Sequence, residues 1–120
     1  MASKYSALNR AANWRKVFGS APALASAVTA AINAGVTICV AAGNDNMQVP
    51  PSNYLATRGD CVDVGATDFN DQRSGFSNFG SWIDVSAAGS SVYSTYSNAY
   101  TPTYATGSGT SYSSPFTAGA

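Results

Sequence analysis

The stretch VTICVAAGNDN, residues 36–46, decides the fold that this sequence predicts. Its first part, residues 36–42, is a short, almost continuously apolar run rich in β-branched side chains, which is typical of a strand covered on both faces in a parallel sheet. Residues 20–35 precede it and predict a helix, because apolar side chains recur there at helical spacing. These side chains are Leu24, Val28, Ala31 and Ile32. A helix that leads into such a strand is half of an α/β unit.

Both ends of the predicted helix carry residues that suit helix boundaries. Ser20 stands near the cap position, and Pro22 suits a first turn, where no helical hydrogen bond needs its missing N–H. Gly35 suits the position just past the last turn.

The rest of the chain predicts further short strands. Residues 61–68 are consistent with a second strand, and the turn-rich, aromatic residues 69–85 predict turns and a short strand that ends near Val85. Residues 86–114 consist mostly of Ser, Thr, Tyr and Gly, with stretches of period two, and predict a twisted hairpin or extended loops. No charged side chain follows Asp84.

Composition argues against several classes of function. Charged residues make up 10% of the 120 residues and the formal net charge is zero, so there is no electrostatic basis for binding nucleic acid or an anionic membrane. No apolar run reaches the length of a membrane span, and no apolar segment follows the basic N-terminus as it would in a secretory signal. The chain has no histidine and no C-x-x-C pair, which argues against a zinc site.

The two cysteines do not form a disulfide framework. Cys39 lies inside the apolar run and is interpreted as a small buried hydrophobe. A bridge between Cys39 and Cys61 is an alternative that the sequence leaves open.

Two short motifs could carry chemistry. In GTSYSSPFTAGA, residues 109–120, small residues precede Ser111 and Pro115 fits a first helical turn, so a hydroxyl could stand at the positive end of a helix. By itself the motif is equally a helix cap. In Gly43-Asn44, an Asn amide at the end of a strand could donate to an anionic oxygen, although the sequence there is also rich in turn residues.

In this order, the motifs resemble the subtilisin-like serine peptidases, and among them the branch typified by proteinase K. VTICVAAGNDN is similar to the family's oxyanion-hole loop, VGATDFNDQRSGFSNFGSWIDVSAAGSSVYST to the stretch that follows, and GTSYSSPFTAG to the nucleophile signature. The resemblance covers about residues 23–120. It implies an α/β fold of three layers around a parallel sheet, of which this chain is the C-terminal part, truncated at both ends. Residues 20–120 are then a partial peptidase domain, and residues 1–19 an unassigned arm.

The resemblance implies roles for eight residues. Ser111 is the expected nucleophile, and Asn44 and the Ser111 backbone N–H are the expected donors to the oxyanion. A wall of the pocket for the residue before the scissile bond is expected from Ala41, Ala42 and Gly43. Chemistry would need no cofactor, but a structural calcium is expected at the Asp84 carboxylate and the carbonyls of Gly59 and Cys61. A surface or turn aspartate is the alternative for Asp84.

The sequence departs from the family pattern in several places. The family's triad runs Asp, His, Ser along the chain, and this chain has no histidine. The family's S-L-G-G substrate strand is not recognisable in NWRKVFGS, residues 13–20, and three family residues are replaced. The replacements are Tyr112 for Met, Phe116 for His and Ala88 for Pro.

The resulting prediction is a segment of a secreted serine endopeptidase that acts on polypeptides. It would carry the nucleophile and the oxyanion-hole Asn, and would be inactive alone because the triad His and Asp are missing. An inactive, truncated or degenerate relative that serves as an interaction module is the alternative. The extracellular location rests on the family alone, and the sequence predicts no oligomeric state.

Overall fold

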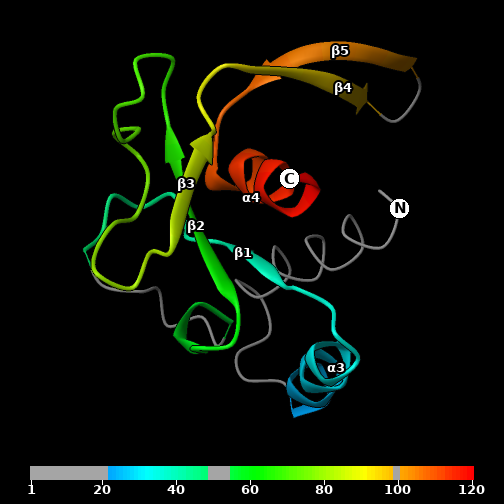
Figure 1. The fold of residues 1–120 in the computed structure, drawn as a ribbon. Helices are drawn as coiled ribbons and strands as arrows, with labels where there is room; N and C mark the ends of the chain where they lie inside the picture. Colours follow the sequence, from blue (N-terminus) through cyan, green and yellow to red (C-terminus); the bar gives the residue numbers. More distant parts are fainter. Residues whose placement is uncertain (1–21, 49–54, 99–100) are drawn as a thin grey trace.

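The computed structural model describes residues 22–48, 55–98 and 101–120 (Figure 1). The predicted arm, residues 1–19, and the cap residue Ser20 lie outside the described residues. The elements in chain order are α3 (Pro22–Asn33), β1 (Cys39–Ala41), the 3-10 helix η1 (Leu55–Thr57), β2 (Val62–Thr67), β3 (Val85–Ala88), β4 (Val92–Asn98), β5 (Thr101–Gly107) and α4 (Thr110–Gly119).

Three parallel strands form the central sheet, in the order β1-β2-β3. Val40 pairs with Asp63, and Gly65 pairs with Ser86. The middle strand β2 is buried along most of its length, as expected of a parallel strand that is covered on both faces. The predicted α/β class with a parallel sheet is therefore confirmed.

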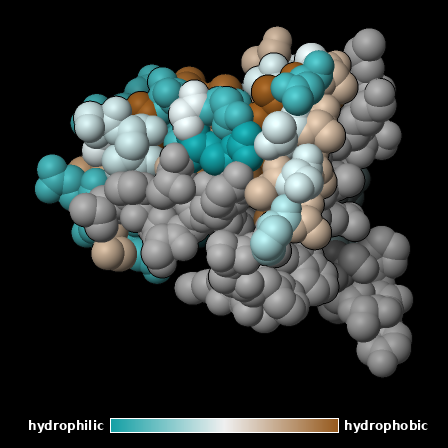
Figure 2. Space-filling view, turned by 90° about the horizontal axis from the view of Figure 1, so that it is seen from below, coloured by the Kyte–Doolittle hydropathy of each residue, from teal (hydrophilic) through white to brown (hydrophobic). Residues whose placement is uncertain are grey.

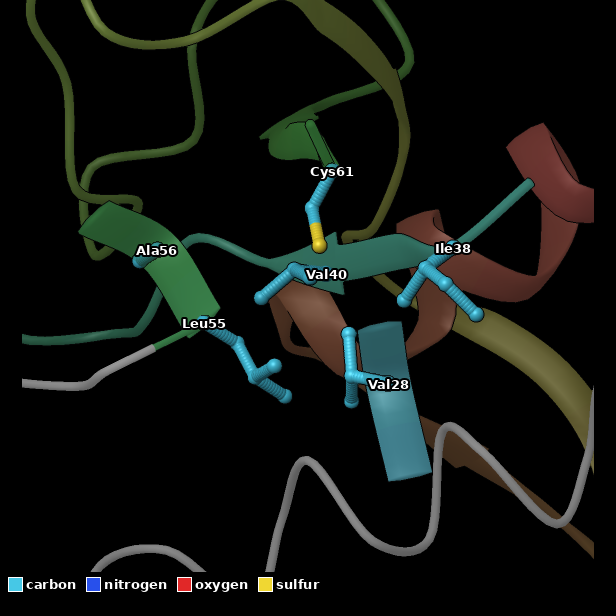
Figure 3. Packing of buried hydrophobic residues seen from close by; sticks show 6 residues of the cluster. All are labelled: Val28, Ile38, Val40, Leu55, Ala56 and Cys61. Atoms are coloured by element: carbon cyan, nitrogen blue, oxygen red, sulfur yellow. The ribbon is translucent and has the colours of Figure 1, made fainter. Parts of the chain in front are cut away.

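Helix α3 covers one face of β1 and builds the apolar core there. Val28 from α3 packs with side chains from β1, η1 and the start of β2 (Figure 3). The buried members of this cluster are Val28, Ile38, Val40, Leu55, Ala56 and Cys61. The helix ends at Asn33, and the predicted stop Gly35 lies just past it, where the N–H groups of Gly35 and Val36 donate to the carbonyls of Ile32 and Ala31 at 2.9 and 3.0 Å.

Helix α4 covers the other face of the sheet. It contacts all three strands, and Ser114 Oγ donates to the Cys39 carbonyl at 3.2 Å. Because side chains alternate along a strand, Ile38 and Val40 point to the α3 side while Cys39 and Ala41 point to the other. In Figure 1, β1 accordingly passes between α3 and α4, which gives three layers.

The Ser- and Tyr-rich segment forms an antiparallel hairpin of β4 and β5 that stands beside α4 (Figure 1). The rings of Tyr93 and Tyr104 stack on it with centroids 5.5 Å apart. Of the two predictions for this segment, the hairpin is confirmed. On the face shown in Figure 2, strongly hydrophobic residues are scattered among hydrophilic and intermediate ones. Among the described residues, no helix has both the length and the apolar character needed to cross a membrane.

Several predicted boundaries are wrong. A strand begins at Val85 instead of ending there, because β3 forms by pairing with β2 from Val64 onward and its small, polar side chains give no strand pattern of their own. Pro115 lies in the second turn of α4 and not in the first, so the Ser111 carbonyl cannot receive the helical hydrogen bond from residue 115. The first two strands are shorter than predicted.

The cysteines are both free thiols, which settles the alternative that the sequence left open. Cys61 is buried and Cys39 only half-buried, so Cys61 fills the role of buried hydrophobe more fully than Cys39. Burial raises the pKa of both thiols, to about 11 for Cys61.

Candidate active site

Two loops that are far apart in the sequence meet at the carboxyl end of β1. Asn44 follows β1, and its Oδ1 accepts the Thr110 backbone N–H at 2.8 Å and the Thr110 hydroxyl at 3.0 Å. The Gly43 N–H in turn donates to Thr110 Oγ1 at 3.0 Å. These three hydrogen bonds join the loop after β1 to the first residue of α4.

The bonds also fix the orientation of the Asn44 amide. The Thr110 N–H is a donor, and the Thr110 hydroxyl acts as one in this contact. The amide oxygen Oδ1 of Asn44 therefore faces Thr110, and the amino group Nδ2 faces away from it. Asn44 is exposed, and its Nδ2 lies 3.4 Å from the position of a Cβ on Gly109, beside the start of α4.

Glycines allow the close approach of these two loops. Gly43 has φ +104°, and a Cβ there would lie 2.5 Å from Asn78 Nδ2. Gly109 has φ +155°, and a Cβ there would lie 3.1 Å from Ser111 Oγ and 3.4 Å from Asn44 Nδ2. The hydroxyl of Ser111 and the amino group of Asn44 therefore converge on the same small space beside Gly109.

Ser111 is the second residue of α4 and is half-buried. Its N–H is one of the amides that the first turn of an α-helix leaves without an intrahelical acceptor. The neighbouring amides are engaged, Thr110 with Asn44 and Tyr112 with the Gly109 carbonyl at 3.0 Å. The positive end of the helix dipole favours negative charge at this place. A hydroxyl, a backbone N–H and a side-chain amide thus surround a position that suits a developing oxyanion.

The residues predicted as a pocket wall occupy the last part of β1 and the turn after it. Ala41 and Gly43 are half-buried, whereas Ala42 is fully buried. Ala42 is held at both ends of its backbone, since its N–H donates to the Val64 carbonyl at 3.0 Å and its carbonyl accepts Asn78 Nδ2 at 3.0 Å. Its side chain is enclosed by the protein, so Ala41 and Gly43 are the two members of the predicted wall that reach the surface.

Asp84, the carboxylate of the predicted calcium site, lies just before β3 beside a second aspartate, Asp63 of β2, which was not part of that prediction. Asp84 is exposed, and its Oδ2 accepts the Asp63 N–H at 2.8 Å. Asp63 is 4% exposed, and its Oδ1 has no hydrogen-bond partner within the described part of the chain. Burial and the neighbouring Asp84 carboxylate raise the pKa of Asp63 to about 7.

This donor set fits an oxygen-preferring cation such as calcium. No group of three or more His, Cys, Asp or Glu side chains that could hold a metal occurs among residues 22–48, 55–98 and 101–120, so further ligands would have to be carbonyls or water. Cys61 could supply only its carbonyl, because its raised pKa keeps the thiol protonated. Gly59 is exposed at the turn just before it.

Two residues at the site were not singled out from the sequence. Thr110 lies inside the nucleophile motif and Asn78 inside the quoted stretch of residues 64–95, but the motifs alone assign no role to either. Asn78 is buried against the loop that carries Asn44. The motifs that contain them are the sequence signal by which they could be found. The hydrogen bonds that give them a role, Thr110 to Asn44 and Asp45 to Asn78, join residues 66 and 33 positions apart and leave no local pattern in the sequence.

Comparisons with known proteins identify the family to which the chain is similar. Residues 5–120 match the subtilase family. The chain is 46% identical over 96 residues to thermitase of Thermoactinomyces vulgaris, a match that covers 80% of this chain and 33% of that protein. It is 44% identical over 107 residues to the extracellular serine proteinase of Thermus sp. (strain Rt41A), covering 85% of this chain and 24% of that protein.

A solved structure is also similar. The crystal structure of a cold adapted subtilisin-like serine proteinase superposes with a TM-score of 0.68 at 40% identity, covering 85% of this chain and 36% of that one. The chain thus spans about a quarter to a third of the length of the relatives that it matches.

Proposed function

The chain belongs to the subtilase family, and we propose that it is the part of a subtilisin-like serine endopeptidase that carries the nucleophile, Ser111, and the oxyanion-hole asparagine, Asn44. The observation that carries this proposal is the junction of Asn44 with Thr110. It binds the amide oxygen of Asn44 to the start of α4, while Asn44 Nδ2 and Ser111 Oγ both lie beside Gly109.

In this mechanism, Ser111 Oγ attacks the carbonyl carbon of a peptide bond and its proton passes to a histidine base. Negative charge collects on the former carbonyl oxygen, where Asn44 Nδ2 and the Ser111 N–H donate to it. Collapse of the tetrahedral intermediate breaks the C–N bond, and the base returns the proton to the leaving amine. The acyl group stays on Ser111 until water, activated by the same base, releases the carboxylic acid.

The base must come from outside this sequence, since the chain contains no histidine. In subtilisin itself, loss of the triad serine or histidine lowers kcat by about 10⁶-fold. We therefore expect the chain alone to hydrolyse peptides at most feebly, even with the proposed donors to the oxyanion.

Other properties of the whole protein follow from its relatives. A relative is named an extracellular serine proteinase, which supports polypeptide substrates and an extracellular location for this protein also. Calcium, where bound, would be held by Asp84, Asp63 and carbonyls such as those of Gly59 and Cys61, and would stabilise the junction of β2 and β3. It takes no part in the chemical steps.

A second candidate function is a non-catalytic interaction module. The absence of histidine from the sequence favours it, because a serine without a base has no means of activation. Under this alternative, the Asn44–Thr110 junction is only a structural link between β1 and α4.

A chimera distinguishes the endopeptidase from the non-catalytic interaction module. The matched part of the chain replaces the corresponding segment of the Thermus proteinase, whose remaining part would supply the aspartate and histidine of the family's triad. The endopeptidase proposal predicts peptide hydrolysis and stoichiometric fluorophosphonate labelling of Ser111, both lost in Ser111→Ala. The matched control Ser113→Ala, in the same helix, should keep both. A folded chimera that neither hydrolyses peptides nor takes the label would overturn the proposal and favour the interaction module.

A further inference from the structure

The loop that carries Asn44 has little stability of its own. Residues 43–47 follow a strand of three residues, and two of them, Gly43 and Asn46, have left-handed backbones with φ +104° and +52°. An asparagine pays a conformational cost in that region unless neighbouring contacts hold it there. Something outside the loop must therefore fix the shape that aims the Asn44 amide.

Asn78 supplies those contacts. Its Oδ1 accepts the N–H groups of Asp45 at 3.0 Å and Met47 at 2.9 Å, and its Nδ2 donates to the Ala42 carbonyl at 3.0 Å. Its backbone N–H also donates to the Gly43 carbonyl at 3.0 Å. One side chain thus holds the residue before the turn and two residues after Asn44.

The assignment of oxygen and nitrogen in this amide is unambiguous. Two backbone N–H groups can bind only an oxygen, and the Ala42 carbonyl can bind only a donor. Asn78 is 1% exposed, so in the folded chain these bonds are made within the protein and not to water. The Nδ2 atom also lies where a Cβ of Gly43 would stand, which explains the glycine at that position.

The segment around Asn78 supports the loop at further points. The Asn46 N–H donates to the Phe76 carbonyl and the Phe79 N–H donates to the Met47 carbonyl, both at 2.9 Å. Arg73 Nη1 donates to Asn46 Oδ1 at 3.0 Å and to the Ser77 carbonyl at 2.6 Å. Residues 73–79 therefore form a cradle along one side of the loop, with the Asn78 side chain at its centre.

We propose that Asn78 is a positioning residue for catalysis, which fixes residues 43–47 so that the Asn44 amide faces the oxyanion beside Ser111. This proposal rests on the function proposed above, because the contacts of Asn78 matter for catalysis only if Asn44 donates to the oxyanion. Asn78 does not touch the reacting atoms, and it acts through Asn44.

Nuclear magnetic resonance of the full ¹⁵N-labelled chain tests the proposal without any catalytic turnover. Asn78→Ala should accelerate hydrogen exchange at the Asp45 and Met47 amides by about tenfold or more relative to amides of β2, since each loses a buried acceptor. It should also move the chemical shifts of the Asn44 side-chain NH₂ group toward those of an asparagine whose side chain is mobile in solvent.

Two comparison variants sharpen the test. Ser74→Ala removes a side chain that is 3% exposed in the same segment, whose bond goes to Ser90 Oγ at 2.7 Å, and should leave the Asn44 signals unchanged. Asn78→Asp keeps the oxygen that accepts from Asp45 and Met47 and sets a carboxylate oxygen against the Ala42 carbonyl in place of the donor, so slow exchange at Asp45 and Met47 should persist while the bond to Ala42 is lost. This second variant also keeps the proposal testable if Asn78→Ala fails to fold.

Unchanged Asn44 signals in folded Asn78→Ala, equal shifts in Ser74→Ala, or rapid Asp45 and Met47 exchange in Asn78→Asp would each overturn the proposal. Failure of the proposed function gives a different result. In that case the chimera leaves Ser111 unlabelled, while Asn78→Ala still shifts the Asn44 signals in the chain.

Discussion

Thr110 is the residue through which the two halves of the site touch. Its backbone N–H and hydroxyl both bind Asn44 Oδ1, and the hydroxyl oxygen also accepts the Gly43 N–H. Thr110 is only 1% exposed, so its N–H and hydroxyl depend on Asn44 and Gly43 for their hydrogen bonds and not on water. The exposed Asn44 amide is thus held by Thr110, the buried neighbour of the proposed nucleophile Ser111.

Thr110→Val keeps the shape of this side chain and removes its hydroxyl. Gly43 then loses an acceptor and Asn44 keeps only the backbone bond, so the amide gains freedom to rotate. In the chimera we expect kcat to fall by about tenfold or more with KM nearly unchanged, because the oxyanion contact is made only in the transition state. Thr110→Ser restores the hydroxyl and should restore most of kcat. A KM effect as large as the kcat effect would contradict this role.

Ser113 lies one turn further along α4, and removal of its hydroxyl, unlike that of Thr110, is expected to do no harm. Its Oγ is fully buried and has no hydrogen-bond partner in the described part of the chain. Ser113→Ala removes a polar atom whose desolvation is uncompensated, so we expect the free energy of unfolding to stay equal or rise by about 1 kcal/mol. Urea unfolding measures this, and a loss of more than about 1 kcal/mol would show that the hydroxyl has an unrecognised partner.

At the scale of elements, the junction of β2 and β3 is held by the backbone and by one carboxylate. The Asp84 N–H donates to the Asp63 carbonyl at 3.0 Å, while the Asp84 carboxylate accepts the Asp63 N–H at 2.8 Å. This reciprocal pair starts the parallel ladder that brings β3 alongside β2. It also places a second carboxylate, that of Asp63, in a buried position next to the first.

The raised pKa of Asp63 predicts a pH dependence of stability. Its pKa rises from 3.8 to about 7 on folding, so between these values the folded chain holds a proton that the unfolded chain has lost. The free energy of unfolding should therefore fall as pH rises from about 4 to about 7, and level off above that. Asp63→Asn should remove this component of the slope, as measured by urea unfolding in the presence of a chelator. An unchanged slope in the variant would show that Asp63 ionises normally.

Calcium should act at the same junction. If Asp84 and Asp63 hold the ion, millimolar calcium raises the melting temperature of the chain, since a ligand that binds only the folded state stabilises it. Asp84→Asn removes a ligand charge and should abolish most of the rise, while the exposed control Asp71→Asn should keep it. An equal calcium response in the Asp84 variant and the parent would place the ion elsewhere.

The elements differ in how well the sequence predicted them. Helix α3 was predicted because its apolar spacing and its glycine stop are both local signals. Strand β3 was misplaced because its Ser and Ala residues have weak strand preference, and its conformation comes from pairing with β2. Asn44 and Ser111 were predicted as site residues from motifs that occur in a fixed order. Thr110 and Asn78, which hold the Asn44 loop, act through contacts between distant segments, and such contacts leave no local sequence pattern.

At the scale of the whole molecule, three segments meet at one end of the parallel sheet. The loop after β1 carries Asn44, the cradle of residues 73–79 holds that loop, and the start of α4 brings Ser111 beside it. Parallel strands place their carboxyl ends at one edge, which is where α/β proteins build their sites. The fold therefore brings together within this chain Asn44 and Ser111, the proposed oxyanion donor and the proposed nucleophile.

The central claim is that Asn44 and Ser111 act on one reacting carbonyl, and kinetics of Asn44→Ala in the chimera test it most directly. In subtilisin, removal of one oxyanion-hole donor costs about 10²–10³-fold in kcat. We predict a loss of that size with KM unchanged within about threefold, and no loss in the exposed control Asn70→Ala. A folded Asn44→Ala chimera with the parent's kcat, or one whose loss lies in KM, would contradict the account.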